Sequence, residues 1–386
     1  MTKNRVLVVL AAISFVLAAR LAGMHQSSLV IQDRSSDKQP QVQLAAPGTV
    51  QLAYVDSDGS ESTVWSLTPA TGAREKLLTV GHANGYPIKA SADPAGIFLA
   101  YTALADGTEP AFKGSLWMAR IHGESPPFLT DDRVDYGWTP KWSPRGSQFI
   151  YEKKILLPNT GPADRYYNQL AVGDASGKTR VVYSDFASLE LVPIGWSANG
   201  ESVFVDRIFP EGDSLYVIDV RSGTARSLVA HLTDTAAAYL ELSPNGRQIV
   251  ASILVNRTVP SYALITVSTK DGHIDQILAG ASQHYRAAWG TDDSSLLTFE
   301  RGSFIRHNTP STGQVTAPRE LVKIQLSGTQ PRVLAPLGSS PDGQWVALRA
   351  YYASSDRLFL WHQGTGSDLI SVPSGHWVEF VGWINR

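Results

Sequence analysis

The chain has 386 residues, of which 43% are hydrophobic and 18% are charged, with a net charge of −2 and no cysteine. This charge balance gives no sign of nucleic-acid binding, and the lack of cysteine excludes disulfides, thiolate metal ligands and a cysteine nucleophile. The length fits two or three domains or one large all-β unit.

The first segment predicts export. Residues 1–24 place Lys3 and Arg5 before an apolar run from Val6 to Ala19, as in a signal peptide. The run is shorter than the roughly 20 residues that span a bilayer, but an uncleaved membrane anchor is the alternative, with Arg20 reaching the interface. In both cases we expect the rest of the chain in the periplasm or outside the cell. Residues 25–46 are mostly polar and predict a flexible linker.

A short phrase then recurs through residues 47–386. Its copies include KWSPRGSQFIYEK (141–153), GWSANGESVFVDR (195–207), ELSPNGRQIVASI (241–253), AWGTDDSSLLTFER (288–301) and GSSPDGQWVALRA (338–350). One hinge residue can be aligned in each unit, at 46- to 54-residue intervals: Ser91, Ser143, Ser197, Ser243, Gly290 and Ser340. Repeats of this period indicate propellers or solenoids. The Pro, Asn or Asp and Gly after the hinge are typical of a tight turn between antiparallel strands.

Each hinge is followed by three strand-like runs, with a second turn signal before the last one. One unit is therefore a four-stranded antiparallel sheet, the blade of a β-propeller. Residues 50–79 supply three strands of a further blade, and the C-terminal HWVEFVGWINR resembles the missing first strand. We expect an all-β fold, a seven-bladed β-propeller closed by pairing of the C-terminal strand with the first blade, which also removes sheet edges. The recurring tryptophans predict packing between blades: Trp142, Trp196, Trp289 and Trp383.

The phrases WSPRG, WSANG, LSPNG and SSPDG resemble the W-S-P-D-G repeat of the TolB-like family of exported propellers, with WD-like repeats. The resemblance covers about residues 48–386 and implies a protein-binding role in the cell envelope. The chain departs from the family pattern because that family has six blades behind an α/β domain, whereas seven blades and no such domain are expected here. Similar propellers precede the hydrolase domain of prolyl-oligopeptidase-type peptidases, but this sequence has no G-x-S-x-G nucleophile motif.

Two segments between second and third strands are long enough to indicate function, 153–169 and 301–320, and a shorter one lies at 105–115. They should share one face with the starts of the strands that line the central channel. Aromatic, titratable and basic residues near those positions are the candidate binding residues: Tyr86, Trp138, Tyr239, His284, Arg286, His376, Glu379, Arg207 and Arg301. Basic residues at the ends of second strands predict either a ring that attracts an acidic partner or ordinary edge protection: Lys153, Lys154, Arg207, Arg257, Arg301 and Arg349.

Two functions stay open at this point. The first is a binding module without catalysis or cofactor, a monomer that grips a protein or extended polymer of the cell envelope and no nucleic acid. The alternative is a hydrolase or lyase with a divalent metal or an acid/base cluster at the channel mouth. Its candidate histidines are His82, His231, His284, His376 and His307, the last in a long loop, although no H-x-H or H-x-x-E motif joins two of them.

Overall fold

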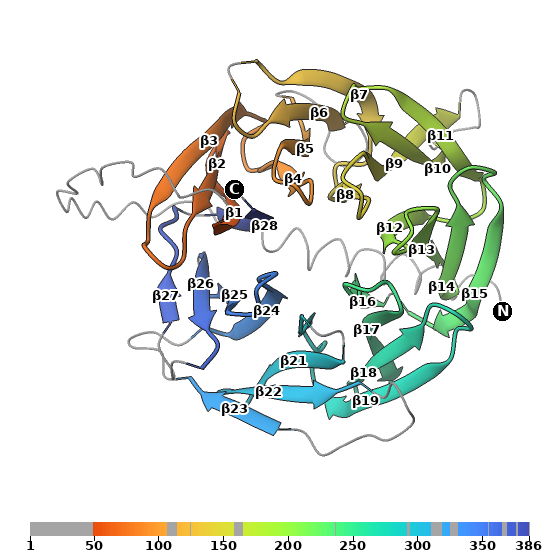
Figure 1. The fold of residues 1–386 in the computed structure, drawn as a ribbon. Coiled ribbons are helices and arrows are strands. Elements are labelled where there is room, and N and C mark those ends of the chain that lie inside the picture. The colour runs from red at the N-terminus through yellow and green to blue at the C-terminus, as the bar shows by residue number, and fades with distance from the viewer. Residues whose placement is uncertain are drawn as a thin grey trace. The chain divides into compact units, whose positions relative to one another are not determined.

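The computed structural model describes residues 49–105, 114–123, 125–157, 165–235, 237–291, 294–309, 319–324, 331–353, 355–364, 369–375 and 377–385. Within these ranges the chain forms seven sheets of four antiparallel strands each, arranged as blades around one axis (Figure 1). The predicted all-β, seven-bladed propeller is thereby confirmed. The predicted leader (1–24) and linker (25–46) lie outside the described residues. The described part of the chain has no helix that is long and apolar enough to cross a membrane.

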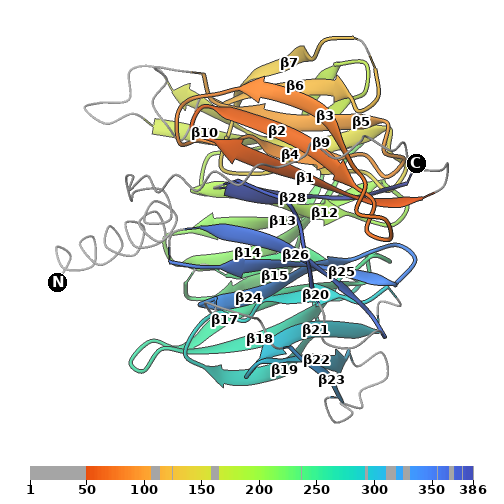
Figure 2. The ribbon, with the colours of Figure 1, turned by 90° about the vertical axis from the view of Figure 1, so that its left-hand side faces the viewer.

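Each blade runs from an inner strand at the axis to an outer strand at the rim (Figures 1 and 2). Blade 1 contains β28 (Trp377–Asn385), β1 (Val50–Asp58), β2 (Glu61–Leu67) and β3 (Arg74–Gly81). Blade 2 contains β4 (Lys89–Ala92), β5 (Phe98–Ala103), β6 (Gly114–Arg120) and β7 (Phe128–Val134). Blade 3 contains β8 (Lys141–Trp142), β9 (Gln148–Leu157), β10 (Arg165–Asp174) and β11 (Thr179–Asp185). Blade 4 contains β12 (Glu190–Trp196), β13 (Ser202–Phe209), β14 (Gly212–Asp219) and β15 (Ala225–Thr233).

The remaining three blades follow the same order. Blade 5 contains β16 (Ala238–Leu242), β17 (Gln248–Asn256), β18 (Ser261–Ser268) and β19 (Ile274–Ala281). Blade 6 contains β20 (Ala287–Trp289), β21 (Ser295–Glu300), β22 (Ser303–Asn308) and β23 (Arg319–Lys323). Blade 7 contains β24 (Val333–Ser339), β25 (Trp345–Tyr351), β26 (Asp356–His362) and β27 (Leu369–Ser371).

The ring closes as predicted, through the last strand of the chain. β28 pairs antiparallel with β1, from Val50 opposite Asn385 to Ser57 opposite Trp377, with one register shift between Ala53 and Tyr54. Leu52 and Tyr54 of β1 and Val378 of β28 are buried in one apolar cluster with the inner faces of β25 and β26. The closing strand therefore joins the first and last blades by both hydrogen bonds and packing.

The repeated phrase forms the turn between the first and second strands of a blade. In blade 3 the Ser143 amide donates to the Gln148 carbonyl (2.7 Å), and the Gly146 amide donates to the Ser143 carbonyl (2.9 Å). Gly146 has a φ of 68°, a left-handed value that suits glycine. In blade 2 the same two bonds are made at Asp93, so the hinge predicted at Ser91 was two residues early.

The tryptophans of the repeat tie neighbouring blades together. The indole N–H of Trp196 on β12 donates to the Lys141 carbonyl on β8 (2.8 Å), one blade away. The other indoles make the same bond to the preceding inner strand: Trp142 to Ser91, Trp289 to Glu241 and Trp383 to Gly338. The prediction that these residues pack between blades is confirmed.

We call the face on which the inner strands begin the top face; it also carries the turns between second and third strands. Polar side chains at the top ends of the strands hold the connection that enters the next blade. Ser252 accepts a hydrogen bond from the Tyr285 amide (2.9 Å), and Glu152 accepts one from the Leu191 amide (2.9 Å). Ser62 and Asp213 hold the amides of Ile88 and Ala237 in the same way. The top face is therefore held by side-chain bonds and not by strand pairing alone.

Candidate functional site

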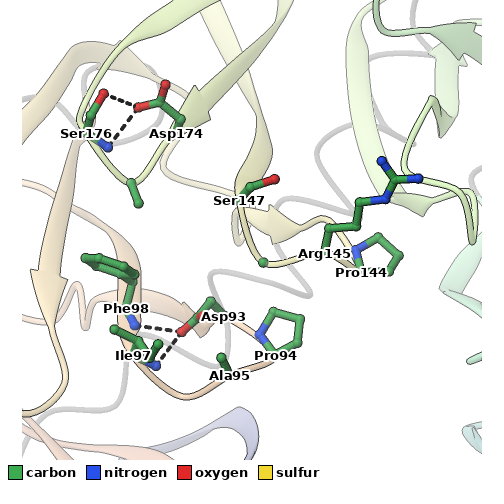
Figure 3. Close-up of a pocket in the computed structure, with 12 residues that line it drawn as sticks. Asp93, Pro94, Ala95, Ile97, Phe98, Pro144, Arg145, Ser147, Asp174 and Ser176 are labelled. Carbon is green, nitrogen blue, oxygen red and sulfur yellow. Dashed lines mark hydrogen bonds between the residues drawn. The ribbon is translucent and has the colours of Figure 1, made fainter.

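A cleft of about 720 Å³ lies on the opposite face, among the turns of blades 2 and 3 (Figure 3). Both carboxylates in its lining are engaged within their own turns. Asp93 accepts from the amides of Ile97 and Phe98 (2.6 Å each), and Asp174 accepts from the amide (2.8 Å) and hydroxyl (2.6 Å) of Ser176. Figure 3 shows the Arg145 side chain directed away from both carboxylates. This cleft is a junction between turns and offers no convergent reactive groups.

The top face instead gathers side chains from five blades into one connected set, which we call the top-face cluster. Its members follow one another around the axis through blades 5, 6, 7, 1 and 2, each in contact with the next: Tyr239, Arg286, Tyr351, Arg349, Glu379 and Lys89. Four of the nine residues predicted from the sequence belong to this cluster or touch it: Tyr239, His284, Arg286 and Glu379.

Arg286 lies between two tyrosines. Its guanidinium carbon is 4.2 Å from the centre of the Tyr239 ring and 4.3 Å from that of Tyr351, and its Nη1 donates to the Tyr351 hydroxyl (2.6 Å). A guanidinium over an aromatic face is attracted by the ring quadrupole. Burial raises the pKa of Tyr351, so its hydroxyl stays protonated and can accept the bond from Arg286 while donating its own proton.

Arg349 and Lys89 share the carboxylate of Glu379. Arg349 Nη1 lies 2.9 Å from one Glu379 oxygen, Lys89 Nζ lies 2.9 Å from the other, and Arg349 also contacts Asp356 at 2.6 Å. Burial alone would raise the pKa of Glu379, but Lys89 and Arg349 outweigh it and lower that pKa to about 2. Glu379 is thus an ionised link between three blades and is not placed to donate a proton near neutral pH.

Tyr239 has an unusual backbone for a bulky residue. Its φ is 56°, in the left-handed region that costs side-chain-bearing residues energy, and it lies where the pairing of β16 with β17 shifts register. The side chain is nevertheless 44% exposed. His284 packs its ring edge-on to Tyr239 and 4.1 Å from the Tyr262 ring centre, and burial lowers its pKa. The neighbourhood of Tyr239 is therefore an exposed aromatic surface whose histidine is neutral near pH 7.

Blades 3 and 4 bring acidic groups to the same face. Lys154 contacts Asp135 at 2.7 Å and Glu190 at 3.9 Å, and burial raises the pKa of Glu152 beside them. Asp206 and Asp213 form a second buried pair. Burial, with repulsion from Asp213, raises the pKa of Asp206 well above its usual range, and burial raises that of Asp213 to about 7. Two carboxyls in contact cannot both ionise cheaply, so this pair retains a proton.

The other predicted site residues are not members of the top-face cluster or are outside the described residues. Tyr86 stacks edge-on with Tyr136 (6.0 Å), Trp138 is half-buried between β7 and β8, and Arg207 is paired with Asp185 (2.7 Å). Arg301 is an exposed turn residue with a φ of 50°. His376 lies outside the described residues.

Three of the candidate histidines have local structural partners. His82 is buried against Ser62 (2.8 Å), and the exposed His231 pairs with Asp234 (2.7 Å). His307 was predicted to lie in a loop, but it is a buried residue of β22 that is hydrogen-bonded to Thr298 (2.9 Å) and Glu300 (3.2 Å). In the part of the chain that the structure describes, no three His, Asp or Glu side chains are grouped so that they could hold a metal ion.

Two of the predicted long loops are shorter than expected. β9 and β10 extend over most of 153–169, so only 158–164 separates them, and those residues are outside the described chain. The segment 301–320 was wrongly assigned to one loop, because β22 begins two residues after Arg301.

Most of the basic side chains predicted around the top face have a partner within the chain. Lys153, Lys154, Arg207 and Arg349 each contact a carboxylate, and Arg257 donates to the Asp234 carbonyl. They do not form a ring of uncompensated charge.

The sequence-based site missed Lys89 and Tyr351 and placed Arg349 only in the basic ring. Arg349 and Tyr351 are separated by one residue, so they lie on the same side of β25. That alternation at the top end of a second strand was the available signal. Lys89 had no comparable signal, because its partner Glu379 lies 290 residues away in the chain.

No protein-family model and no curated protein matches the chain. Solved structures similar to it include one from a study of two prolyl endopeptidases, at 14% identity and a TM-score of 0.56 over 87% of this chain and 49% of that chain. This chain thus spans about half the length of that enzyme. An oligogalacturonate lyase in complex with manganese matches at 13% identity and a TM-score of 0.55, over 82% of this chain and 91% of that one.

TolB from Acinetobacter baumannii is a further match, at 15% identity and a TM-score of 0.46, over 87% of this chain and 82% of that chain. At these identities a shared fold is what the matches show. The propeller fold that the WSPDG-like repeats predict is confirmed by the seven four-stranded blades of this chain.

Proposed function

We propose that this chain is an exported, non-catalytic binding module that holds a polypeptide partner on its top face. The observation that carries the proposal is the stacking of Tyr239, Arg286 and Tyr351, which come from three different blades and of which Tyr239 is exposed. Tyrosine and arginine are the residue types that, with tryptophan, concentrate binding energy in protein interfaces. Export is proposed from the pattern of residues 1–24.

Exposed apolar side chains also lie on the same face. Phe186 is 71% exposed and stacks on Tyr167 at 4.6 Å between ring centres, next to the start of blade 4. Val259 is 68% exposed in the turn between β17 and β18, and Leu189 and Val255 are also exposed on this face. Exposed apolar groups beside aromatic anchors are typical of surfaces that dock another protein.

The backbone around the cluster favours binding by a preformed surface. Asp213 holds the Ala237 amide just before Tyr239, and Ser252 holds the Tyr285 amide just before Arg286. A surface whose side chains are already placed loses less entropy when a partner binds.

The lyase or hydrolase alternative would need groups of this face to be available for chemistry. Among the described candidates, His284 is packed between Tyr239 and Tyr262, and Glu379 carries two ion pairs. These contacts suit structural and binding roles, which is why the binding module is the function that we propose.

The test is selection of peptides from a random linear library on phage against the purified full-length chain, followed by calorimetry with the enriched peptides. Tyr239→Gly removes the exposed ring at a position whose φ glycine accepts, so the fold should persist. We expect affinity to fall at least tenfold in this variant. Phe128→Ala is the matched control, because Phe128 is 41% exposed at the start of β7, away from the top face. If no peptide is enriched, or if both variants lose affinity equally, the proposed function is wrong.

A further inference from the structure

Arg286 differs from the two other cations of the top-face cluster, Lys89 and Arg349, because it has no carboxylate partner among the described residues. Lys89, Lys154 and Arg349 each have a carboxylate within 4 Å. None of the described carboxylates lies within that distance of Arg286, which contacts the rings of Tyr239 and Tyr351 and the Tyr351 hydroxyl. A half-buried charge without a counterion is costly, and a ligand that supplied one would recover that energy.

The surrounding groups do not neutralise this charge. Glu379, the carboxylate of the cluster, is already shared by Lys89 and Arg349, and Asp356 is held by Arg349. His284, on the other side of Tyr239, is neutral near pH 7 because burial and Arg286 lower its pKa. Counted together with Asp356, the cluster therefore carries three cations and two carboxylates, an excess of one positive charge.

The geometry also selects the kind of anion. The guanidinium is a planar fork with five N–H groups, of which one donates to Tyr351, so others can bind the two oxygens of a carboxylate. A doubly charged group such as a phosphate would meet repulsion from Glu379 and Asp356, whereas one negative charge balances the excess.

On these grounds, and resting on the proposed function, we infer that Arg286 is a carboxylate-binding subsite of the top face, which takes an Asp or Glu side chain or the C-terminal carboxylate of the bound polypeptide. The rings of Tyr239 and Tyr351 hold the guanidinium in place, and Tyr239, being exposed, contacts the residue that carries the carboxylate. Arg286 is thereby the residue that determines specificity for an acidic group.

The experiment repeats the phage selection with the full-length wild-type chain and with Arg286→Gln. The wild-type chain should enrich peptides with Asp or Glu at one fixed position, and Arg286→Gln should lose that preference. Arg357→Gln is the matched control, because Arg357 also lies over a tyrosine, Tyr352, at 5.4 Å, but is exposed on the third strand of blade 7. It should keep the preference. Thermal unfolding of each variant verifies that the fold persists.

Synthetic versions of one enriched peptide then identify the carboxylate. Replacing its Asp or Glu by Asn or Gln tests the side chain, and amidating its C-terminus tests the terminal group. We expect one of these changes to weaken binding to the wild-type chain at least tenfold and to have less than a twofold effect on Arg286→Gln. In Arg286→Lys the loss of affinity on neutralising the peptide should be intermediate between those in the wild-type chain and in Arg286→Gln. Lysine keeps the positive charge but cannot bind both carboxylate oxygens with a planar guanidinium.

The possible failures are distinguishable. If peptides bind in a Tyr239-dependent way but neither neutralisation weakens them, the carboxylate subsite is wrong and the binding function stands. If no peptide is enriched and an acidic polysaccharide such as polygalacturonate binds instead, the polypeptide occupant and the proposed function are both wrong.

Discussion

The carboxylate of Glu379 on the last strand lies 2.9 Å from the ammonium of Lys89 on the inner strand of blade 2, across 290 residues of chain. The same carboxylate lies 2.9 Å from Arg349 of blade 7. One side chain of the closing strand therefore links the blades on both sides of it, at the face that we propose for binding.

Glu379→Gln should destabilise the propeller, because it leaves two partly buried cations without their shared counterion. We expect the free energy of unfolding at pH 7 to fall by about 2 kcal/mol, measured by urea denaturation. The lowered pKa of Glu379, about 2, also sets a pH dependence. The stability that ionised Glu379 contributes is complete above the ordinary pKa of a glutamate and is lost as the pH falls through about 2.

Glu61→Gln is the control for this change, because Glu61 is an exposed residue at the start of β2 on the same face. Its effect should stay within about 0.5 kcal/mol. Equal stabilities of Glu379→Gln and the wild type would show that the ion pairs do not support the ring.

The Asp206–Asp213 pair should have the opposite pH dependence. Both pKa values are raised in the folded chain, that of Asp213 to about 7, so the folded state binds protons that the unfolded state releases above about pH 4. Stability from this pair is complete below that pH and decreases as the pH rises towards 7. Asp206→Asn should flatten this decrease and make the chain about 2 kcal/mol more stable than the wild type at pH 8, since the amide can donate to Asp213 without a proton from solvent.

Urea denaturation between pH 5 and pH 8 measures this effect. Asp132→Asn, at an exposed side chain of β7, should leave the slope of stability against pH unchanged. A wild-type slope that Asp206→Asn does not change would exclude the pair as its source.

The inter-blade indole bonds give a third prediction. Trp196→Phe removes the N–H that donates to the Lys141 carbonyl and should cost about 1–2 kcal/mol through the lost bond and the smaller ring. Trp65→Phe is the matched comparison, because the Trp65 indole nitrogen is buried and has no hydrogen-bond partner. It should cost less than about 1 kcal/mol. Urea denaturation measures the free energy of unfolding of the two variants. Equal losses of stability would mean that the indole hydrogen bond contributes nothing measurable.

The blade pattern was predictable because its signals are local. In blades 2, 3, 4, 5 and 7 the turn after the hinge ends in a left-handed glycine, as at Gly146. The hinge and strand predictions were wrong where the turn signal is weak or occurs twice. At KASADPAG both Ser91 and Asp93 resemble a hinge, and hydrogen bonding selects Asp93. In blade 6 the turn between β21 and β22 contains Arg301 in a left-handed conformation, which is uncommon for a residue with a side chain. For this reason β22 was predicted as part of a loop.

The candidate site was predictable only in part, because it is assembled by register between distant strands. Tyr239, Arg286 and Glu379 could be found from their place at the starts of inner strands. Their contacts could not, since the Arg286–Tyr351 bond spans 65 residues and the Lys89–Glu379 pair spans 290. The same limit explains why Arg207 was grouped with this face as a binding residue, although Asp185 holds it between blades 3 and 4.

Ring closure gives the last prediction. Deleting residues 377–386 removes β28 and exposes the hydrogen-bonding edge of β1 together with Leu52 and Tyr54, which are fully buried in the intact chain. We expect the truncated chain to aggregate or to lose cooperative thermal unfolding. Because Val50 lies opposite Asn385, a variant that carries residues 377–385 ahead of residue 49 needs a turn between the two partners. With an Asn-Gly linker between residues 385 and 49 it can form the same pairing through a short hairpin loop, and it should recover a cooperative transition. Circular dichroism melting of the intact, truncated and rearranged chains measures this. A truncated chain that unfolds cooperatively at the wild-type temperature would show that β28 is dispensable, and a rearranged chain that fails to recover would show that the pairing alone does not close the ring.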